Sequence, residues 1–244
     1  MELLGLKIDV LVTIGTPGAR AAKQATKTLP VVVAIIGDAV AAGIVPSLAR
    51  PGGNITGTQF HFPATMTKRI ELLRDLSPRL ARTAVIWNAP NEHSIGPALN
   101  SMEVTARSLK IDVEPFAVRT SEDFAPTVTA ILQRRHEAVI VDDHMLRRHG
   151  RTVADLALRG RLPSVGDREY ATDGGLLAYA PNRTEVWRGA ATLIDKIFRG
   201  TSPADLPFQQ ADRIDLLINL KTAKALGLTM PPSLLARADH VIEW

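Results

Sequence analysis

The sequence predicts an α/β protein built on doubly wound parallel sheets. Short runs rich in Val and Ile alternate with segments of helical period, which is the pattern of βαβ units whose sheet is buried on both faces. Breakers cluster at residues 50–54 and 201–207, and neither cluster is long enough to form a flexible linker. No internal repeat or low-complexity tract interrupts this pattern, so a solenoid or a disordered tail is not expected.

The expected strands share a short apolar run that ends in polar or turn-forming residues. They are residues 10–14, 31–36, 55–60, 84–88, 113–118, 138–141 and 176–180. Three apolar stripes between them predict helices that cover a sheet: Met66, Ile70, Leu73 and Leu76; Leu99, Met102, Ala106 and Leu109; Phe124, Val128, Ile131 and Leu132.

The strongest amphipathic stripe lies between residues 187 and 198. Its members are Trp187, Ala190, Ala191, Ile194, Ile197 and Phe198, and Gly200 follows in the position of a C-terminal cap. The spacing predicts that this stripe faces the sheet, so we interpret its two aromatic residues as core and not as part of a ligand site.

Composition and charge exclude several classes of protein. The 244 residues are 45% hydrophobic and 22% charged with a formal net charge of +4, so neither a nucleic acid nor an anionic membrane is required as a partner. The basic clusters 134–135 and 147–151 lack interleaved aromatic residues that stack on bases, which again argues against nucleic acid. The absence of cysteine excludes disulfides and thiolate chemistry. No apolar run reaches the length of a membrane helix, and the chain as given shows no export signal.

The motifs of common enzymes are also missing. The sequence contains no nucleophile elbow, phosphate-binding loop, dinucleotide fingerprint or zinc-protease helix. His144 and His149 are five residues apart, a spacing that does not place two metal ligands on one helical face. We therefore expect no catalytic residues, no cofactor and no metal site.

A ligand site is expected where the strands end, because ligands of open parallel sheets bind beyond the carboxyl ends of the strands. After the first strand, Thr16 is a candidate N-cap, Pro17 suits the first helical position, and the amides that follow, from Gly18 on, are available to an anion. A capped helix without a ligand explains this motif equally well.

Polar residues follow the other strands in the same way. They are Asp38, Asn88, Ser94, Asp142 with Asp143, and Asp167 with Glu169. Each one alone is more often a turn or capping residue than a ligand contact, but their shared placement at one edge favours a site. An anion-binding helix end together with carboxylates suits a zwitterion such as an amino acid.

Two stretches resemble a known family. Residues 47–57 read SLARPGGNITG, and residues 218–229 read INLKTAKALGLT and continue after one residue as PPSLLARAD. Both stretches are similar to the ABC transporter substrate-binding proteins that are related to tryptophan and tyrosine receptors, and the resemblance covers essentially the whole chain.

The resemblance implies a type I periplasmic-binding-protein fold with two lobes joined by a hinge. Residues 1–59 and 181–210 would form the first lobe and residues 60–180 the second, while residues 211–244 contain a strand and helices that are not assigned to either. The ligand would lie in the cleft between the lobes, and closure would present it to a membrane permease outside the cytoplasm. Residues implied to line the cleft are Thr16 and Asp38 from the first lobe, and Asn88, Ser94, Asp142 and Asp167 from the second.

Aromatic amino acids are the ligands that the family resemblance brings forward. Phe60, Trp87, Tyr170 and Tyr179 are candidates to stack on such a ligand, and each is equally suited to the core. We include Tyr179 in the expected site.

The chain departs from the family in two places. Ala39 follows Asp38 where relatives have proline, and the strand, helix and strand that precede this region in relatives are not part of the sequence. The first lobe is therefore expected to lack its first strand and helix, to expose an apolar edge and to self-associate, unless the start codon is misplaced.

Two other functions remain open. The effector-sensing domain of a transcription regulator shares the two-lobed architecture, but no DNA-reading helix pair precedes the first lobe here. A nucleotide-sugar or related α/β enzyme is the third possibility, and the missing phosphate loop argues against it.

Overall fold

The chain forms two compact units, each assembled from separate stretches of sequence. The computed structural model describes residues 5–89, 92–141 and 143–243. The first unit contains residues 1–62 and 181–214, and the second contains residues 63–180 and 215–244. The chain therefore passes between the units three times, at residues 62–63, 180–181 and 214–215.

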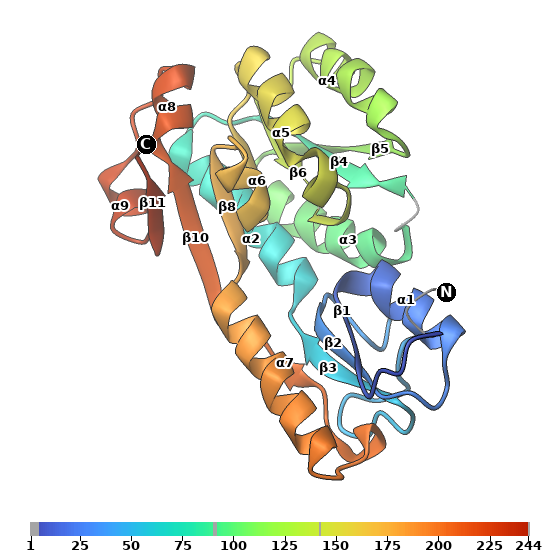
Figure 1. The fold of residues 1–244 in the computed structure, drawn as a ribbon. Helices are drawn as coiled ribbons and strands as arrows, with labels where there is room; N and C mark the ends of the chain where they lie inside the picture. Colours follow the sequence, from blue (N-terminus) through green and yellow to red (C-terminus); the bar gives the residue numbers. More distant parts are fainter. Residues whose placement is uncertain (1–4, 90–91, 142, 244) are drawn as a thin grey trace. The chain divides into compact units, whose positions relative to one another are not determined.

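The first unit is built on a four-stranded sheet with the order β1-β2-β3-β9, and all its pairings are parallel. Its elements are β1 (Leu11–Thr13), α1 (Gly15–Ala25), β2 (Val31–Ile36), β3 (Ile55–Gln59), α7 (Arg183–Phe198), η4 (Pro203–Asp205) and β9 (Gln209–Gln210). Figure 1 shows α1 and α7 beside this sheet.

Strand β2 is apolar throughout because both faces of this sheet are covered. Val31 and Val33 pack with Ala19 and Ala22 of α1, whereas Val32 points to the opposite face, where α7 packs against β2 and β3. All six residues of β2 are buried. A continuous apolar run, instead of an alternating one, is what a doubly covered parallel strand requires.

The second unit is built on a seven-stranded sheet with the order β11-β10-β8-β7-β6-β4-β5. Its strands are β4 (Arg82–Asn88), β5 (Asp112–Val118), β6 (Ala138–Val141), β7 (Ser164–Gly166), β8 (Leu177–Pro181), β10 (Ile214–Asn219) and β11 (His240–Ile242). Its helices are α2 (Phe62–Leu76), α3 (Glu92–Leu109), η3 (Ser121–Asp123), α4 (Phe124–Gln133), α5 (Asp143–Arg159), α6 (Arg168–Thr172), α8 (Leu220–Leu226) and α9 (Pro232–Leu235).

Strands β4 to β8 of this sheet are parallel, and one cluster of core residues lies under helices α4 and α5. Ile86 and Val139 pack there with Ile131 of α4 and Val153 of α5. Strand β10 runs antiparallel to β8, since Asn182 N donates to Arg213 O at one end of the pair and Asn219 N donates to Leu176 O at the other.

All seven expected strands form, with bounds within two residues of those expected, and β10 is the expected C-terminal strand. The expected stripes over residues 66–76, 99–109 and 124–132 lie in α2, α3 and α4. Strands β7, β9 and β11 were not expected as strands, because each has only two or three residues and shows no periodicity.

The expected orientation of α7 was wrong. Trp187 is 42% exposed and Phe198 is 65% exposed, while the buried residues of this helix are Val186, Ala190 and Leu193. The sheet-facing stripe is therefore offset from the one that the aromatic residues define. The expected cap is confirmed: Gly200 follows the C-cap residue with φ of +94°, a conformation that glycine adopts without strain.

Tyr170 is a core residue, which removes it from the candidates for ligand stacking. Its side chain is fully buried in the second unit, and burial raises the pKa of its hydroxyl above the usual value. Two glycines make room for the ring. A Cβ atom added to Gly175 would lie 2.3 Å from Tyr170 Cε1, and one added to Gly166 would lie 2.7 Å from Tyr170 Cδ1.

We predict that Gly175→Ala lowers the free energy of unfolding by about 2–3 kcal/mol, because the new methyl group overlaps the buried ring of Tyr170. Urea denaturation measures this change. Gly53→Ala is the matched control, since no atom lies within 4 Å of an added Cβ there. Equal stability of the two variants would contradict the packing described here.

Candidate functional site

The carboxyl edge of the first unit carries the residues that follow β1, β2 and β3. The start of α1 differs from the expectation, because the helix begins at Gly15 and not after Thr16. Gly15 makes the turn with φ of +73°, and the N-cap residue Ile14 has no side chain that accepts a hydrogen bond. Thr16 is buried inside the first turn and Pro17 is exposed, so the predicted N-cap at Thr16 was wrong.

Gly18 has a packing role in this unit. A Cβ atom there would lie 2.1 Å from Thr13 Oγ1, so the glycine allows α1 to approach the end of β1 closely. The first-turn amides of α1 remain near the carboxyl end of β1, where the dipole of an 11-residue helix favours negative charge.

Asp38 is exposed and caps the turn that follows β2. Its Oδ1 accepts hydrogen bonds from Val40 N at 3.0 Å and from Ala41 N at 2.9 Å. Asp38 therefore serves as a turn residue, and Ala39 occupies the position of the family's proline without breaking the turn. One carboxylate oxygen, Oδ2, takes no part in these two bonds.

Two glutamines that the sequence analysis missed lie at the same edge. Gln59 Oε1 accepts a hydrogen bond from Ala39 N at 3.3 Å, and Gln59 Nε2 donates to Gln210 Oε1 at 3.3 Å. Both residues close parallel strands, β3 and β9. The rule that selected Asp38 missed Gln59, because the expected strand ran to residue 60 and Gln59 lay inside it, whereas β3 ends at Gln59. Gln210 gave no signal, because β9 is too short.

Asp167 and Tyr179 lie together at the carboxyl edge of the second unit. Gly166 of β7 is in register with Ala178 of β8, so the next residues, Asp167 and Tyr179, occupy the following row. Asp167 is 5% exposed and is the N-cap of α6, where its Oδ1 accepts a hydrogen bond from Tyr170 N at 2.8 Å. The capping role is confirmed for this residue, while Tyr179 is half-buried.

Asn88 closes β4 on the same edge. Its Oδ1 is buried and has no hydrogen-bond partner among the residues that the structure describes. A buried acceptor without a partner costs free energy, so this oxygen is a candidate to accept a hydrogen bond from a ligand.

The other residues predicted at this edge lie partly outside the described part. Ser94 lies in α3, which begins two residues earlier at Glu92, and its side chain is outside the described part; Asp142 is outside it altogether. Asp143 is the first residue of α5 and not part of the strand.

Arg69 of α2 is the main residue of this edge that the sequence analysis missed. It is fully buried, and it bridges two strand ends: Nη1 donates to Val141 O of β6 at 3.1 Å, and Nε and Nη2 donate to Tyr179 O of β8 at 3.2 and 2.9 Å. Because β7 lies between β6 and β8, the guanidinium spans the end of the short central strand. No motif marked Arg69, since a single arginine in an amphipathic helix reads as a solvent-facing residue.

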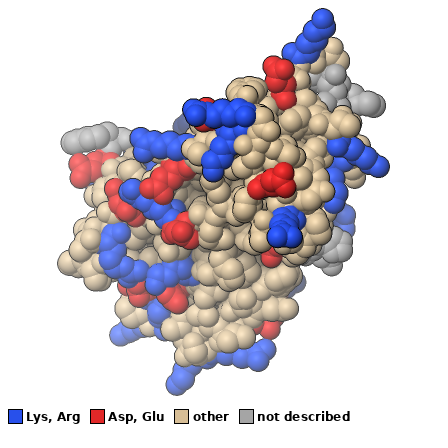
Figure 2. All heavy atoms as spheres, turned by 90° about the horizontal axis from the view of Figure 1, so that it is seen from below, with Lys and Arg blue, Asp and Glu red and all other residues tan. Residues whose placement is uncertain are grey.

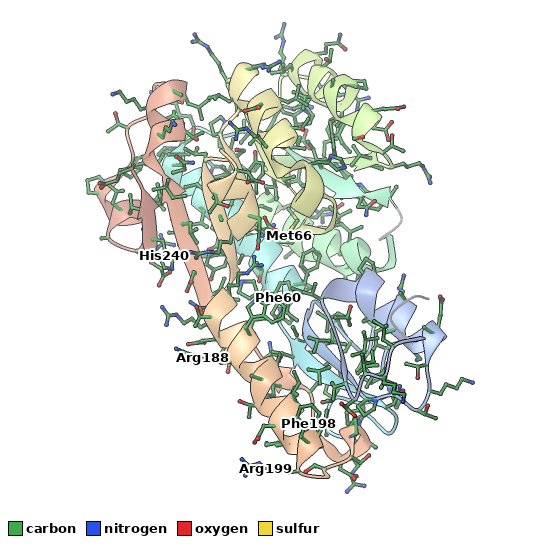
Figure 3. The ribbon with its side chains drawn as sticks, in the orientation of Figure 1. Phe60, Met66, Arg188, Phe198, Arg199 and His240 are labelled. Atoms are coloured by element: carbon green, nitrogen blue, oxygen red, sulfur yellow. The ribbon has the colours of Figure 1, made fainter. Side chains whose placement is uncertain are left out.

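Among the remaining aromatic candidates, Phe60 is 8% exposed and packs edge-to-face on Phe62 with ring centroids 5.9 Å apart. Figure 3 labels Phe60 at the end of the first unit's sheet. Trp87 is half-buried in β4. Because Phe60 already packs on Phe62, we interpret it as a packing residue.

Charges of both signs are distributed over the surface. Figure 2 shows Lys and Arg interspersed with Asp and Glu over the face that it draws. Within residues 5–89, 92–141 and 143–243, no group of three or more His, Asp or Glu side chains is arranged to hold a metal ion. No helix in the described part combines the length and apolar character of a bilayer crossing.

Two known proteins are similar to this chain over most of its length. A curated tyrosine-binding protein of Clostridioides difficile (strain R20291) is 27% identical over 223 residues, and the match covers 91% of this chain but only 64% of that protein. A solved ABC domain from Streptococcus pneumonia in complex with L-Trp matches with a TM-score of 0.87 and 29% identity, covering 99% of this chain and 83% of that one.

Each of the two α/β units is built on a sheet of mainly parallel strands, and the chain crosses between them three times. This is a type I periplasmic-binding-protein fold, which confirms the predicted fold class. The model of the ABC transporter substrate binding protein family matches residues 1–242, so the chain belongs to that family. A LacI-family transcriptional regulator from Bifidobacterium animalis subsp. lactis, 15% identical with a TM-score of 0.60 over 88% of this chain and 77% of its own, shares the fold alone.

We predict that Arg69→Lys lowers the free energy of unfolding by about 3 kcal/mol, because one ammonium group cannot reach Tyr179 O and Val141 O together. Denaturant titration followed by circular dichroism measures the change. Arg188→Lys on the exposed face of α7 is the control and should leave stability within about 0.5 kcal/mol of the parent. An unchanged Arg69→Lys variant would show that the bridge between β6 and β8 contributes nothing.

Proposed function

We propose that this chain is the ligand-binding component of an ABC-type import system. It captures an amino acid with an aromatic side chain between its two units and delivers it, outside the cytoplasm, to a membrane permease. It catalyses no reaction. The observation that carries the proposal is the match of the substrate-binding family over residues 1–242, joined to a solved relative that holds L-Trp and a curated relative named for tyrosine.

The chemistry of the two carboxyl edges supports a zwitterionic ligand. In the first unit, the start of α1 is favourable for a carboxylate, and Asp38 keeps one carboxylate oxygen clear of its turn for an ammonium group. In the second unit, the buried Oδ1 of Asn88 needs a donor. Closure of the two units around the ligand would bring these edges together, and the three crossings form the hinge.

Arg69 gives the second unit a fixed frame for this ligand. By holding Val141 O and Tyr179 O it fixes the backbone at the carboxyl end of β6 and at Tyr179 of β8. A frame held by a buried guanidinium preserves the geometry of the edge when the ligand leaves, so that little ordering entropy is lost on rebinding.

We predict that L-Trp or L-Tyr raises the melting temperature of the protein by several degrees, since a ligand at 100 times its Kd stabilises the folded state by about 2.7 kcal/mol. Differential scanning fluorimetry and calorimetric titration measure the effect. Tryptamine lacks the carboxylate and indole-3-propionate lacks the ammonium, so both should bind at least about tenfold more weakly. If both analogues bound as tightly as L-Trp, the zwitterion hypothesis would be wrong.

We predict that Asp38→Asn weakens binding of L-Trp about tenfold and leaves the melting temperature of the ligand-free protein unchanged. The amide oxygen of asparagine still accepts the hydrogen bonds from Val40 N and Ala41 N, so only the charge is lost. Asp205→Asn removes an exposed carboxylate elsewhere in the first unit and should not alter binding. A parallel loss of stability in Asp38→Asn would assign the residue to the turn alone.

A further inference from the structure

Exposed cations line the amino edge of the sheet in the second unit. Strands β4, β5, β6 and β7 start within two residues of one row of this sheet. One exposed cation precedes each strand by two or three residues, and these cations are, in the order of the strands, Arg79, Lys110, Arg135 and Arg161. Because the four strands are parallel, the residues that precede them lie at the same edge.

Three further exposed cations extend this edge. Arg159 is the last residue of α5. Helix α8 begins at the same edge, since Asn219 N at the end of β10 donates to Leu176 O just before β8, and this helix carries Lys221 and Lys224. Figure 1 shows α4, α5 and α8 at the top of the second unit, and Figure 3 shows long side chains that end in nitrogen there. We call the seven residues the cationic row: Arg79, Lys110, Arg135, Arg159, Arg161, Lys221 and Lys224.

The positive charge of the cationic row is not compensated locally. None of its members forms an ion pair with another described residue, and the acids of this edge are already engaged. Asp112 pairs with Arg82, Glu114 pairs with Arg134, and Glu137 accepts hydrogen bonds from two backbone amides beside the start of β4. The whole chain carries a formal charge of +4, so the residues outside the row carry −3. A modest net charge therefore conceals a concentrated cationic surface.

Three members of the row adopt a backbone conformation that favours glycine. Lys110, Arg135 and Arg161 have φ of +56°, +57° and +55°, and in the described part they are the non-glycine residues with positive φ. Each follows a helix in a Schellman motif, in which the next amide donates to the carbonyl five residues back. The bond from Ile111 N to Ala106 O, at 2.8 Å, is one of the three.

Helix termination does not explain the choice of cations at these positions. Helices α7 and α8 end in the same motif, and there the left-handed residues are Gly200 and Gly227. A cation near a helix C-terminus also interacts favourably with the helix dipole, but α3 and α5 already carry Arg107 and Arg159 in their last turns. A charged side chain is thus present at three positions where glycine fits the backbone better, which indicates a function for the charge.

We propose that the cationic row is a docking surface for the anionic head groups of a phospholipid membrane. The row extends over five strand spacings, from β10 to β5, which is about 24 Å. Long, exposed Lys and Arg side chains in such a row can reach phosphate groups that are spread over a flat surface. Each cation near an anionic bilayer strengthens binding about fivefold, so a few engaged members give measurable binding.

The composition of this edge favours lipid over protein or nucleic acid. A protein interface needs apolar side chains at its centre, whereas Leu132 is the one large apolar residue that is exposed beside the row in the described part. The segments that carry the row, residues 77–81, 107–111, 134–137, 159–163 and 220–224, contain no Phe, Trp or Tyr to stack on bases. The proposed function enters for the location alone, because the bilayer that holds the permease provides an anionic surface.

Glycine substitution tests the row without a cost to the fold. Lys110→Gly, Arg135→Gly and Arg161→Gly, combined in one variant, remove three charges and give each left-handed position the residue that tolerates it best. Cosedimentation measures binding to vesicles that contain about one third phosphatidylglycerol in phosphatidylcholine. At about 0.1 M salt, the glycine variant should bind about 100-fold more weakly than the parent, and its melting temperature should be no lower.

A charge-matched variant of the first unit is the control. Lys27→Gln, Arg50→Gln and Lys196→Gln, combined, remove three exposed cations and give the same net charge as the glycine variant. This control should bind the mixed vesicles within about threefold of the parent. The parent should not bind vesicles of phosphatidylcholine alone, and about 1 M salt should abolish its binding to the mixed vesicles, because the screening length falls to about 3 Å.

Three results would overturn the proposal. They are a parent that does not bind the mixed vesicles, a glycine variant that binds as tightly as the parent, and a control that loses as much affinity as the glycine variant. If the parent ignores vesicles but binds polyglutamate, and the glycine variant does not, the row docks an acidic protein and the membrane proposal is wrong.

Calorimetric titration with L-Trp separates this test from that of the proposed function. The glycine variant should keep the parent's affinity for L-Trp, because the row lies at the amino edge of the sheet and the proposed ligand residues lie at the carboxyl edge. Vesicle binding without L-Trp binding would contradict the proposed function alone, and L-Trp binding without vesicle binding would contradict the docking surface alone.

Discussion

Parallel strand pairing is the constraint on which the rest of this structure depends. Parallel neighbours must be joined by crossovers, so helices cover both faces of the sheet and strands such as β2 become continuously apolar. The same pairing brings the carboxyl ends of β1, β2 and β3 to one edge in the first unit, and those of β4, β6, β7 and β8 to one edge in the second. Polar residues at these edges follow from topology before any ligand is considered.

The sequence predicts this architecture well because its signals are local. Runs of Val and Ile gave the long strands, and the rule for residues after a strand led to Asp38, Asn88 and Asp167. The failures came from tertiary effects. Gly15 adopts a left-handed conformation and α1 begins there, two residues earlier than expected, so Thr16 is a buried residue of the first turn and not the cap. The position of Arg69 depends on strand ends more than 70 residues away, and no local pattern encodes that contact.

Helix α7 shows why amphipathic patterns mislead when a helix has two apolar stripes. The stripe with the larger side chains, Trp187 and Phe198, dominates the pattern, yet the sheet accepts the smaller stripe of Val186, Ala190 and Leu193. Close packing against β2 and β3 favours the smaller side chains. Gly189 fits the same pattern, because a side chain there would contact Gln209 and Thr58. The larger side chains of Trp187 and Phe198 therefore do not pack on this sheet, and they are 42% and 65% exposed.

The three crossings also govern how the chain acquires its structure during synthesis. The first unit needs residues 181–214 for α7 and β9, and the second needs residues 215–244 for most of β10 and for β11. Neither unit is complete until the ribosome has made most of the chain, so the usual order, in which an N-terminal domain folds before the next is translated, does not apply. During synthesis, one face of the sheet formed by β1, β2 and β3 stays exposed until α7 has been translated. A general chaperone therefore has a long interval in which to bind that face.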